Sequence, residues 1–296
     1  MGSAMRLIER CSPVLFLMIW SSGTIFVKLG LEYASVSVFL TIRSVGATVA
    51  LFVALTLITN TGEVWKKLYL TKSLLFQTVL TGLLLQAGYQ SAFFLALYYN
   101  LSPGSLSIVL GTQPILTSLF AGEKLRLTGY LFLALGIFGL TISIIGAREI
   151  GSITSMGIIF GTISVIAISL GSAMQKKLKT DTVASAFYQS LSASLVFLIA
   201  LPLTNIKLTI TPEFILSATW MIVMVSTLGV LLMFYLLKYN SASNVGILFY
   251  VVPILTITLD YLIFDNGVTW TTVAGGLVVL GAVWGFRQTE IPEKQP

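Results

Sequence analysis

The chain has 296 residues, of which 56% are hydrophobic and 9% are charged, and its formal net charge is +6. Soluble domains carry about 25% charged residues, so 17 basic and 11 acidic side chains are too few to cover a soluble protein of this length. The basic residues lie in short groups between apolar runs, which indicates membrane topology and excludes a groove for nucleic acid.

The residue inventory also excludes much catalytic chemistry. The chain has no histidine, which excludes an imidazole base, a histidine metal site and a Ser-His triad. The single cysteine, Cys11, has no second cysteine with which to form an internal disulfide, and the chain lacks a phosphate-binding P-loop motif. We therefore expect no enzymatic activity, no cofactor and no metal site. Residues 1–4 are expected to be an expression scar.

Ten apolar stretches follow one another along the chain, each near the roughly 20 residues that a membrane-spanning helix needs. The gaps between them are too short to hold a soluble domain. We therefore predict an all-α integral membrane protein with ten transmembrane helices. The expected spans are residues 13–30, 35–59, 73–97, 101–121, 128–147, 154–174, 183–204, 214–237, 242–264 and 269–286.

The distribution of Lys and Arg predicts the orientation of these spans, because cytoplasmic loops carry an excess of basic residues. With the N-terminus in the cytoplasm, 13 basic residues fall on the cytoplasmic side, 3 fall on the opposite side, and Arg43 lies within a span. This asymmetry predicts that both termini are cytoplasmic.

Part of the first half recurs in the second. Residues 92–100 resemble residues 232–240 at a displacement of 140, and the Pro-Ile-Leu-Thr sequence at Pro114 recurs at Pro253, displaced by 139. Each half would hold five spans, and an odd number turns the second copy upside down relative to the first. Inverted repeats are typical of secondary transporters, which bind their solute near the membrane midplane. We therefore predict a first repeat at residues 5–149, an inverted second repeat at 150–287 and a cytoplasmic tail at 288–296.

Pro114 and Pro253 fall in the middle of the fourth and ninth expected spans. A proline inside a helix lacks an amide proton and costs about 3 kcal/mol, so the carbonyl groups of Leu110 and Phe249 should lose their usual partners. Both prolines are harmless kinks in one interpretation, because proline is common in membrane helices. Their matching positions favour the other interpretation, in which both are hinge or gating residues beside the transport pathway.

The third span carries Gln86, Tyr89, Gln90 and Phe93, whose spacing predicts a single helix face. Two amides would be costly against lipid, so this face should look into the bundle. It would serve there either as part of a solute site or as hydrogen-bonding glue between helices. The displacement of 140 places Ser226 opposite Gln86 in the second half.

Three further side chains are candidates for contact with a solute. Trp20 lies in mid-span beside small polar residues, where it would either stack on a flat ligand or pack against another helix. Gln113 adjoins Pro114, and Tyr250 lies near Pro253. The expected substrate-binding residues are therefore Trp20, Gln86, Tyr89, Gln90, Gln113 and Tyr250.

Two ionisable residues lie within expected spans, Arg43 in the second and Asp260 in the ninth. Such residues are functional candidates by default. Both lie toward the outer third of the membrane, where a long side chain can reach the interface. Arg43 is expected to pair with Glu32 or to act in coupling, and Asp260 to have an interfacial or proton-coupling role. The glycines of the last span, Gly275, Gly276, Gly281 and Gly285, fit close helix packing or contact in a homodimer.

These features together resemble the drug/metabolite transporter superfamily, EamA type, over essentially the whole chain after residue 4. The resemblance implies a ten-helix exporter of amino acids, related metabolites or drugs in the bacterial inner membrane. It rests on Trp20-Ser-Ser-Gly in the first span, Arg43 early in the second, Pro114 followed by Gly122-Glu123-Lys124-Leu125, and Ser241-Ala-Ser-Asn-Val before Pro253.

We expect a secondary transporter of small amphipathic metabolites, amino acids first, whose partners are the solute and the lipid bilayer. A phosphorylated solute is disfavoured, because a dianion needs two or more buried basic groups and only Arg43 and Lys28 lie near membrane depth. The alternatives are a multidrug exporter of the same fold and a non-transporting membrane scaffold.

Overall fold

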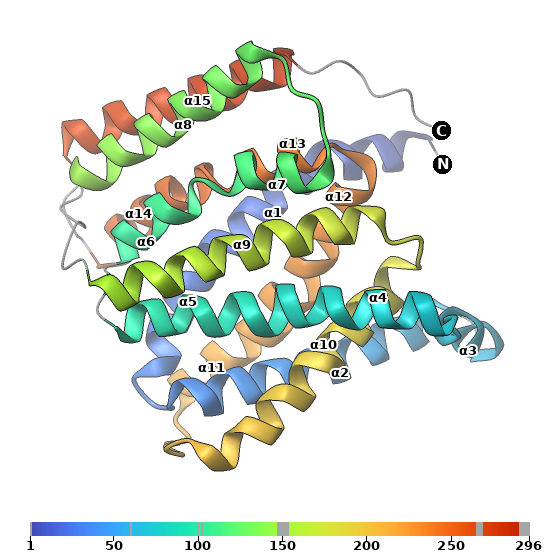
Figure 1. The fold of residues 1–296 in the computed structure, drawn as a ribbon. Coiled ribbons are helices and arrows are strands. Elements are labelled where there is room, and N and C mark those ends of the chain that lie inside the picture. Colours follow the sequence, from blue (N-terminus) through green and yellow to red (C-terminus); the bar gives the residue numbers. More distant parts are fainter. Residues whose placement is uncertain are drawn as a thin grey trace. The chain divides into compact units, whose positions relative to one another are not determined.

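The computed structural model describes residues 2–59, 61–99, 101, 103–146, 154–264 and 269–289, and these residues are almost entirely helical (Figure 1). The first half contains α1 (Gly2–Leu31), α2 (Val36–Ile58), α3 (Thr61–Leu68), α4 (Lys72–Gly82), η1 (Leu83–Gly88), α5 (Tyr89–Tyr98), α6 (Pro103–Leu110), α7 (Gln113–Ala121) and α8 (Leu127–Gly146). The second half contains α9 (Ser155–Lys177), α10 (Thr182–Ala200), η2 (Leu201–Leu203), α11 (Pro212–Trp220), η3 (Met221–Gly229), α12 (Val230–Tyr239), α13 (Ala242–Leu248), α14 (Val251–Phe264) and α15 (Trp270–Thr289).

Seven helical segments of the described chain are long and apolar enough to cross a membrane. The all-helical membrane class is thus confirmed, and seven of the expected spans correspond to long apolar helices. The expected spans at 101–121 and 242–264 are each divided into two short helices, and the last expected span is α15. The seven are Cys11–Leu31, Val36–Ile58, Lys72–Ala96, Leu127–Gly146, Ser155–Lys177, Thr182–Leu203 and Pro212–Tyr239.

The helices form two compact units, and each unit combines segments from both halves of the sequence. The first unit consists of residues 1–91 and 174–239, and the second of residues 92–173 and 240–296. Because most contacts of each half are made with the other half, neither sequence repeat is a compact unit by itself.

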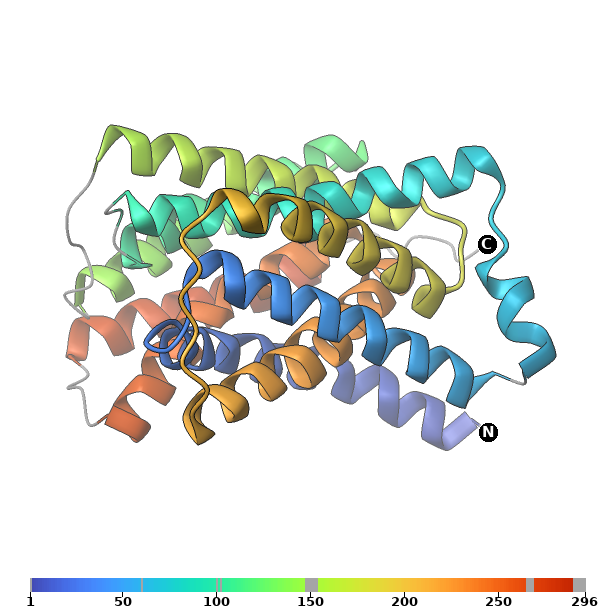
Figure 2. The ribbon, with the colours of Figure 1, turned by 90° about the horizontal axis from the view of Figure 1, so that it is seen from below.

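In the first unit, α2 lies along α10, and α1 packs against α11 and η3 (Figure 1 and Figure 2). Phe39 and Phe214 are the aromatic centre of this core, with Met221 and Val225 of η3 beside them. Hydrogen bonds link α1 to α11: the Ser217 hydroxyl donates to the carbonyl of Phe26 at 2.5 Å. Residues 191 positions apart in the chain are therefore tied together inside one unit.

In the second unit, α8 and α15 run side by side at very short range (Figure 1). A Cβ added at Gly275 would lie 2.4 Å from the amide nitrogen of Ser143, so only glycine allows this backbone approach. The Ser143 hydroxyl donates to the carbonyl of Thr272 at 3.0 Å. This packing explains part of the small-residue pattern of the last span as helix contact within the chain.

Irregular helix geometry recurs at matching places in the two halves. The third and eighth spans each contain a π-helical segment, η1 and η3. The fourth and ninth spans each break at a tight turn, where Gly111 and Thr112 in one, and Phe249 and Tyr250 in the other, donate to carbonyls three residues earlier. The π-helical segments were not predicted. Interruptions of the fourth and ninth spans were expected at Pro114 and Pro253, and the structure has a full break of the helix just before each proline.

The two breaks correct the sequence-based view of the prolines. Pro114 is the second residue of α7 and Pro253 the third residue of α14, so both stand in the first turn of a new helix rather than in a helix interior. First-turn amides have no helical partner, and proline is tolerated there. The expected cost of about 3 kcal/mol per interior proline is therefore avoided by dividing the span.

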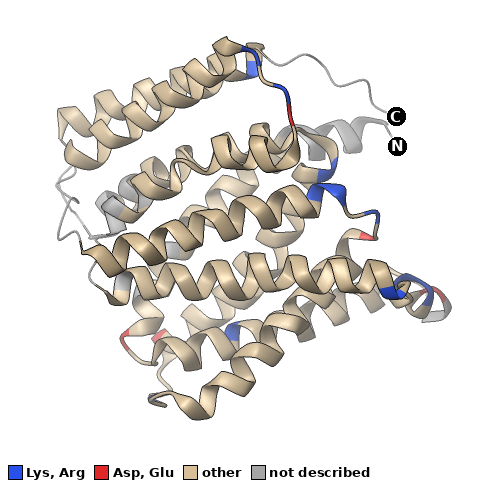
Figure 3. Ribbon diagram, viewed as in Figure 1, with Lys and Arg blue, Asp and Glu red and all other residues tan. Residues whose placement is uncertain are grey.

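Charged residues gather at helix ends, and most helical surface is uncharged (Figure 3). Large apolar side chains such as Leu57 and Ile199 are mostly exposed on the outside of the helices, as lipid contact requires. Lys and Arg concentrate around α3 and the loop before α10 (Figure 3).

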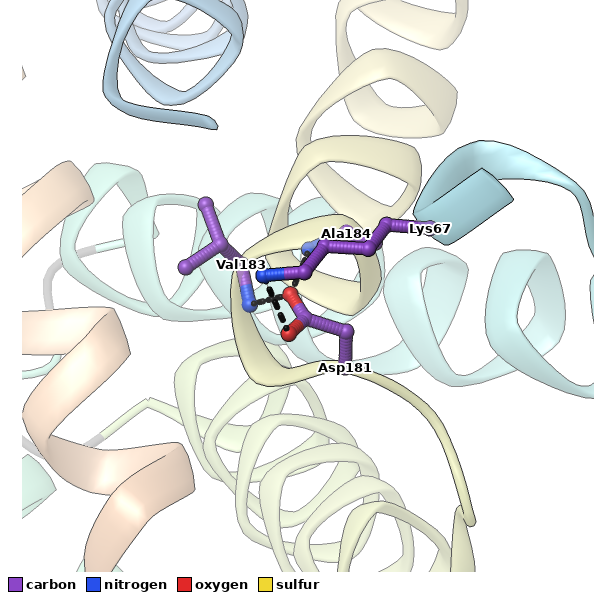
Figure 4. A network of polar contacts seen from close by, with 4 residues as sticks. All are labelled: Lys67, Asp181, Val183 and Ala184. Atoms are coloured by element: carbon purple, nitrogen blue, oxygen red, sulfur yellow. Dashed lines mark hydrogen bonds and ion pairs between the residues drawn. The ribbon is translucent and has the colours of Figure 1, made fainter. Parts of the chain in front are cut away.

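The short helix α3 was not predicted, since its eight residues fall in an expected loop. Val64 and Leu68 bury one side of it against Leu55 and Ala184. An ion pair also joins α3 to the start of α10, with 3.4 Å between the Lys67 ammonium nitrogen and the Asp181 carboxylate (Figure 4). The other carboxylate oxygen of Asp181 accepts from the backbone of α10 and so caps that helix.

Candidate polar site in the membrane region

Gln86 and Gln90 form a buried amide pair in the first unit. The Gln90 amide nitrogen donates to the Gln86 side-chain oxygen at 2.9 Å, and the two residues are 9% and 6% exposed. The side-chain oxygen of Gln90 is buried and has no hydrogen-bond partner among the described residues. An unpaired buried acceptor of this kind is costly unless a donor reaches it, so the pair offers a binding position for a polar hydrogen.

The amide pair begins in the π-helical segment η1, where the usual helical hydrogen-bond ladder is interrupted. Gly82 precedes this segment, and a Cβ there would lie 2.5 Å from the Cα of Gln189 on α10. The close approach of α10 thus accompanies the change in helix geometry. π-Bulges are frequent at functional sites because they re-aim side chains.

Arg43 is the buried cation of the same unit. It lies in α2, is 8% exposed and donates from Nε to the Ser226 hydroxyl of η3 at 2.6 Å. Tyr89, at the start of α5, is within electrostatic range of its guanidinium. The expected ion pair with Glu32 is absent from the described part of the chain, whose ion pair joins Lys67 and Asp181 instead. The sequence analysis predicted only that Ser226 is the counterpart of Gln86 at a displacement of 140. The contact between Ser226 and Arg43 was not predicted.

Trp20 lies on α1 with its ring near that of Phe16, at 5.2 Å between centroids. A Cβ added at Gly229 would lie 3.6 Å from the Trp20 ring, so this tryptophan lies beside the end of η3. Next to it on α1, Ser22 accepts a hydrogen bond from the Trp220 indole at 3.0 Å. Trp20 therefore shares its unit with Arg43 and the amide pair.

Gln113 and Tyr250 belong to the second unit. Gln113 is 2% exposed, and its backbone carbonyl accepts from the Ser169 hydroxyl at 3.4 Å. Tyr250 is fully buried, and its hydroxyl donates to the carbonyl of Leu133 at 3.1 Å. Its ring lies so close to Gly136 that an added Cβ there would be 2.4 Å away. In this structure Tyr250 is a packing residue with a satisfied hydroxyl.

The two breaks lie against each other inside the second unit. A Cβ added at Gly246 of α13 would be 3.0 Å from the Cα of Pro114 on α7. The broken fourth span therefore contacts the broken ninth span where α7 meets α13, at Pro114. Asp260 lies farther along α14, and its side chain is outside the described residues, as is that of Lys28.

Glu123 holds the two broken spans together at one end. Gly122 ends α7 in the left-handed conformation with φ of 75°, which turns the chain toward α13. The Glu123 carboxylate then accepts from the backbone amides of Ala242 at 2.6 Å and Ser243 at 3.0 Å, and from the Ser243 hydroxyl. In the sequence, Gly122-Glu123 served only as part of the family resemblance. The structure shows that Glu123 accepts hydrogen bonds from the start of α13.

Among the described residues, no three His, Cys, Asp or Glu side chains lie together as a metal site would require. The buried polar side chains described in the first unit are instead amides, hydroxyls and the guanidinium of Arg43. Such groups suit recognition of a small polar or charged solute by hydrogen bonds, within an otherwise apolar helical bundle.

The comparisons with known proteins agree with a transport role. Residues 155–287 match the EamA-like transporter family. The chain is 27% identical to the "Uncharacterized transporter YvbV" of Bacillus subtilis (strain 168) over 276 residues, which cover 89% of this chain and 86% of that protein. A solved crystal structure shares the fold with a TM-score of 0.77 at 18% identity, covering 95% of this chain and 98% of its own.

The protein is a multi-pass membrane protein, and the family that it matches is one of transporters and not of enzymes. The match over residues 155–287 to the EamA-like transporter family agrees with the resemblance found in the sequence.

Proposed function

We propose that this transporter carries small amphipathic metabolites, amino acids first, outward across the bacterial inner membrane. Transport would proceed by alternating access between two inverted five-helix repeats of a ten-helix bundle, residues 5–149 and 150–287, with both termini in the cytoplasm. The matching positions of η1 with η3, and of the two broken spans, support the repeat. The excess of basic residues on one side supports the orientation.

The observation that carries the proposal is the amide pair with its unpaired acceptor, the Gln90 side-chain oxygen. A helix-packing role would satisfy both amides, as it does for most buried polar groups. An acceptor left without a donor fits a site that a solute completes. The hydrogen bond from Arg43 to Ser226 supports a position between the sequence halves, because it joins residues 183 apart in the chain.

The proposed solute contacts are therefore ranked by their surroundings. Gln86, Tyr89, Gln90 and Trp20 come first, because they share one unit with the buried cation. Gln113 and Tyr250 come second, since the former is almost fully buried and the hydroxyl of the latter already has an acceptor.

Counterflow of radiolabelled amino acids in proteoliposomes tests this function. Gln90→Ala should weaken apparent affinity for the transported solute about fivefold to a hundredfold, because one hydrogen bond from a buried partner is lost. Gln77→Ala is the matched control: it removes an exposed glutamine of the same span, whose side-chain amide donates to the Ser73 hydroxyl. Absence of counterflow for every amino acid would refute the substrate class, and parental affinity in Gln90→Ala would refute the site.

A further inference from the structure

The guanidinium of Arg43 is a buried cation to which the proposed function assigns no role in binding. Moving a charge out of water costs several kcal/mol even after relaxation, unless a counter-charge or a full set of hydrogen bonds compensates. In the described chain its one side-chain hydrogen bond goes to a neutral hydroxyl, through Nε. No described carboxylate lies within 4.0 Å of it.

The geometry leaves the far edge of the guanidinium available. Arginine has five N–H donors in a planar fork, of which Nε supplies one. The bond from Nε to Ser226 fixes the plane of the fork between α2 and η3. Among the described residues, no hydrogen bond engages either Nη group, and their parallel N–H bonds match the two oxygens of a carboxylate.

The groups described as interacting with the Arg43 side chain are neutral. Ser226 contributes a hydroxyl, and Tyr89 contributes a phenol within electrostatic range. The next residue after Tyr89 is Gln90, half of the buried amide pair. A single positive charge among neutral groups is balanced by one negative charge, which favours a monoanion over a phosphate dianion.

We propose that Arg43 binds the carboxylate of the transported solute, so that the substrate class is amphipathic monocarboxylates, amino acids included. Ser226 is a positioning residue, which holds the guanidinium through Nε while the Nη groups contact the solute. This inference rests on the proposed transport function but concerns a separate chemical group, the carboxylate.

The first test compares ligands that differ only in this group. Thermal stabilisation of the purified full chain in detergent is measured with acetate, butyrate and 3-phenylpropanoate, and with the corresponding neutral amides. We expect stabilisation by the larger carboxylates and none by the amides. Arg43→Gln should weaken carboxylate binding about ten- to a hundredfold, as expected for loss of a charge-assisted pair. Arg43→Lys should restore part of it, since an ammonium keeps the charge but not the fork.

Two further variants separate recognition from folding. Lys67→Gln removes a basic side chain that forms a surface ion pair, and it should bind carboxylates like the parent. Ser226→Ala keeps the charge but frees Nε, so it should weaken the stabilisation by carboxylates, while the amides should still give none. If Arg43→Gln does not fold, the Ser226→Ala comparison decides the question alone.

The outcomes distinguish this inference from the proposed function. Equal stabilisation by acids and amides, or parental carboxylate affinity in both Arg43→Gln and Ser226→Ala, would overturn the role of Arg43, whatever the counterflow result. Arg43-dependent carboxylate binding without counterflow of any amino acid would support the inference and refute the proposed substrate. No binding of any carboxylate by the parent would overturn the inference.

Discussion

Single residues set how closely the helices of this transporter approach one another. Gly275 allows the backbone of α15 to touch that of α8, and Glu123 joins the end of α7 to the start of α13. Both effects come from local chemistry, the missing side chain in one case and a carboxylate facing free amides in the other. Both can be tested by substitution.

Replacing Gly275 with leucine should destabilise the protein strongly. The new Cβ would meet the Ser143 amide nitrogen at 2.4 Å, so α8 and α15 would have to separate, at a cost of about 1–3 kcal/mol or more. Gly281→Leu is the matched control on the same helix, because nothing lies within 4 Å of its added Cβ. Melting temperatures in detergent check the prediction. Equal melting temperatures of Gly275→Leu and Gly281→Leu would contradict it.

Glu123→Ala should leave two amides at the start of α13 without their acceptor, and the Ser243 hydroxyl as well. We expect a loss of about 1–3 kcal/mol in unfolding free energy, with Glu123→Gln between this variant and the parent. Glu32→Ala, at an exposed loop position, is the control. Denaturant titration in detergent measures the difference. An alanine variant as stable as the parent would show that the carboxylate contact has little energetic weight.

At the scale of elements, the irregular segments carry the proposed mechanism. Spans three and eight contain π-helical segments, and spans four and nine are divided at tight turns. Divided helices leave backbone groups outside the regular ladder, which membrane proteins tolerate only inside protein or beside water. Hinge residues absorb the backbone rotations of a conformational change, so these turns are where we expect movement.

Pro253→Ala tests whether the break in the ninth span is a hinge. Alanine supplies the amide proton that proline lacks, which lets residue 253 bond to the Phe249 carbonyl and continue the helix backward. The variant should fold with unchanged or slightly higher thermal stability and should transport more slowly in proteoliposomes, by severalfold. Pro212→Ala is the control, since Pro212 also stands in a first turn but at the end of a span. A Pro253→Ala protein that transports at the parental rate would make the break structural only.

At the scale of the whole molecule, orientation follows from the loops. The basic residues of the first unit concentrate around α3 and the loop before α10 (Figure 3), and these loops fall on the expected cytoplasmic side. A fluorescent protein fused after Pro296 should therefore fluoresce in bacterial cells, whereas alkaline phosphatase fused there should be inactive. An active phosphatase fusion would contradict a cytoplasmic C-terminus and reverse the predicted orientation.

The sequence alone determined the membrane class, the family resemblance and the approximate limits of the apolar helices. Hydropathy and helix length are local properties, set by the preference of each side chain for lipid or water. For example, α2 occupies residues 36–58 where 35–59 was expected, and α8 occupies 127–146 where 128–147 was expected. The amide pair was also foreseen, because Gln86 and Gln90 are close in the chain.

Tertiary structure alone decided the features that depend on distant residues. The partner of Arg43 is Ser226, 183 residues away, and not Glu32 in the preceding loop. The prolines stand in the first turns of new helices, and Pro114 of α7 packs there against Gly246 of α13. The π-helical segment η1 adjoins a close contact with α10, and Glu123 caps a helix of the other half. In each case the lowest free energy depends on which backbone groups the neighbouring helix satisfies or displaces, and no local pattern encodes that.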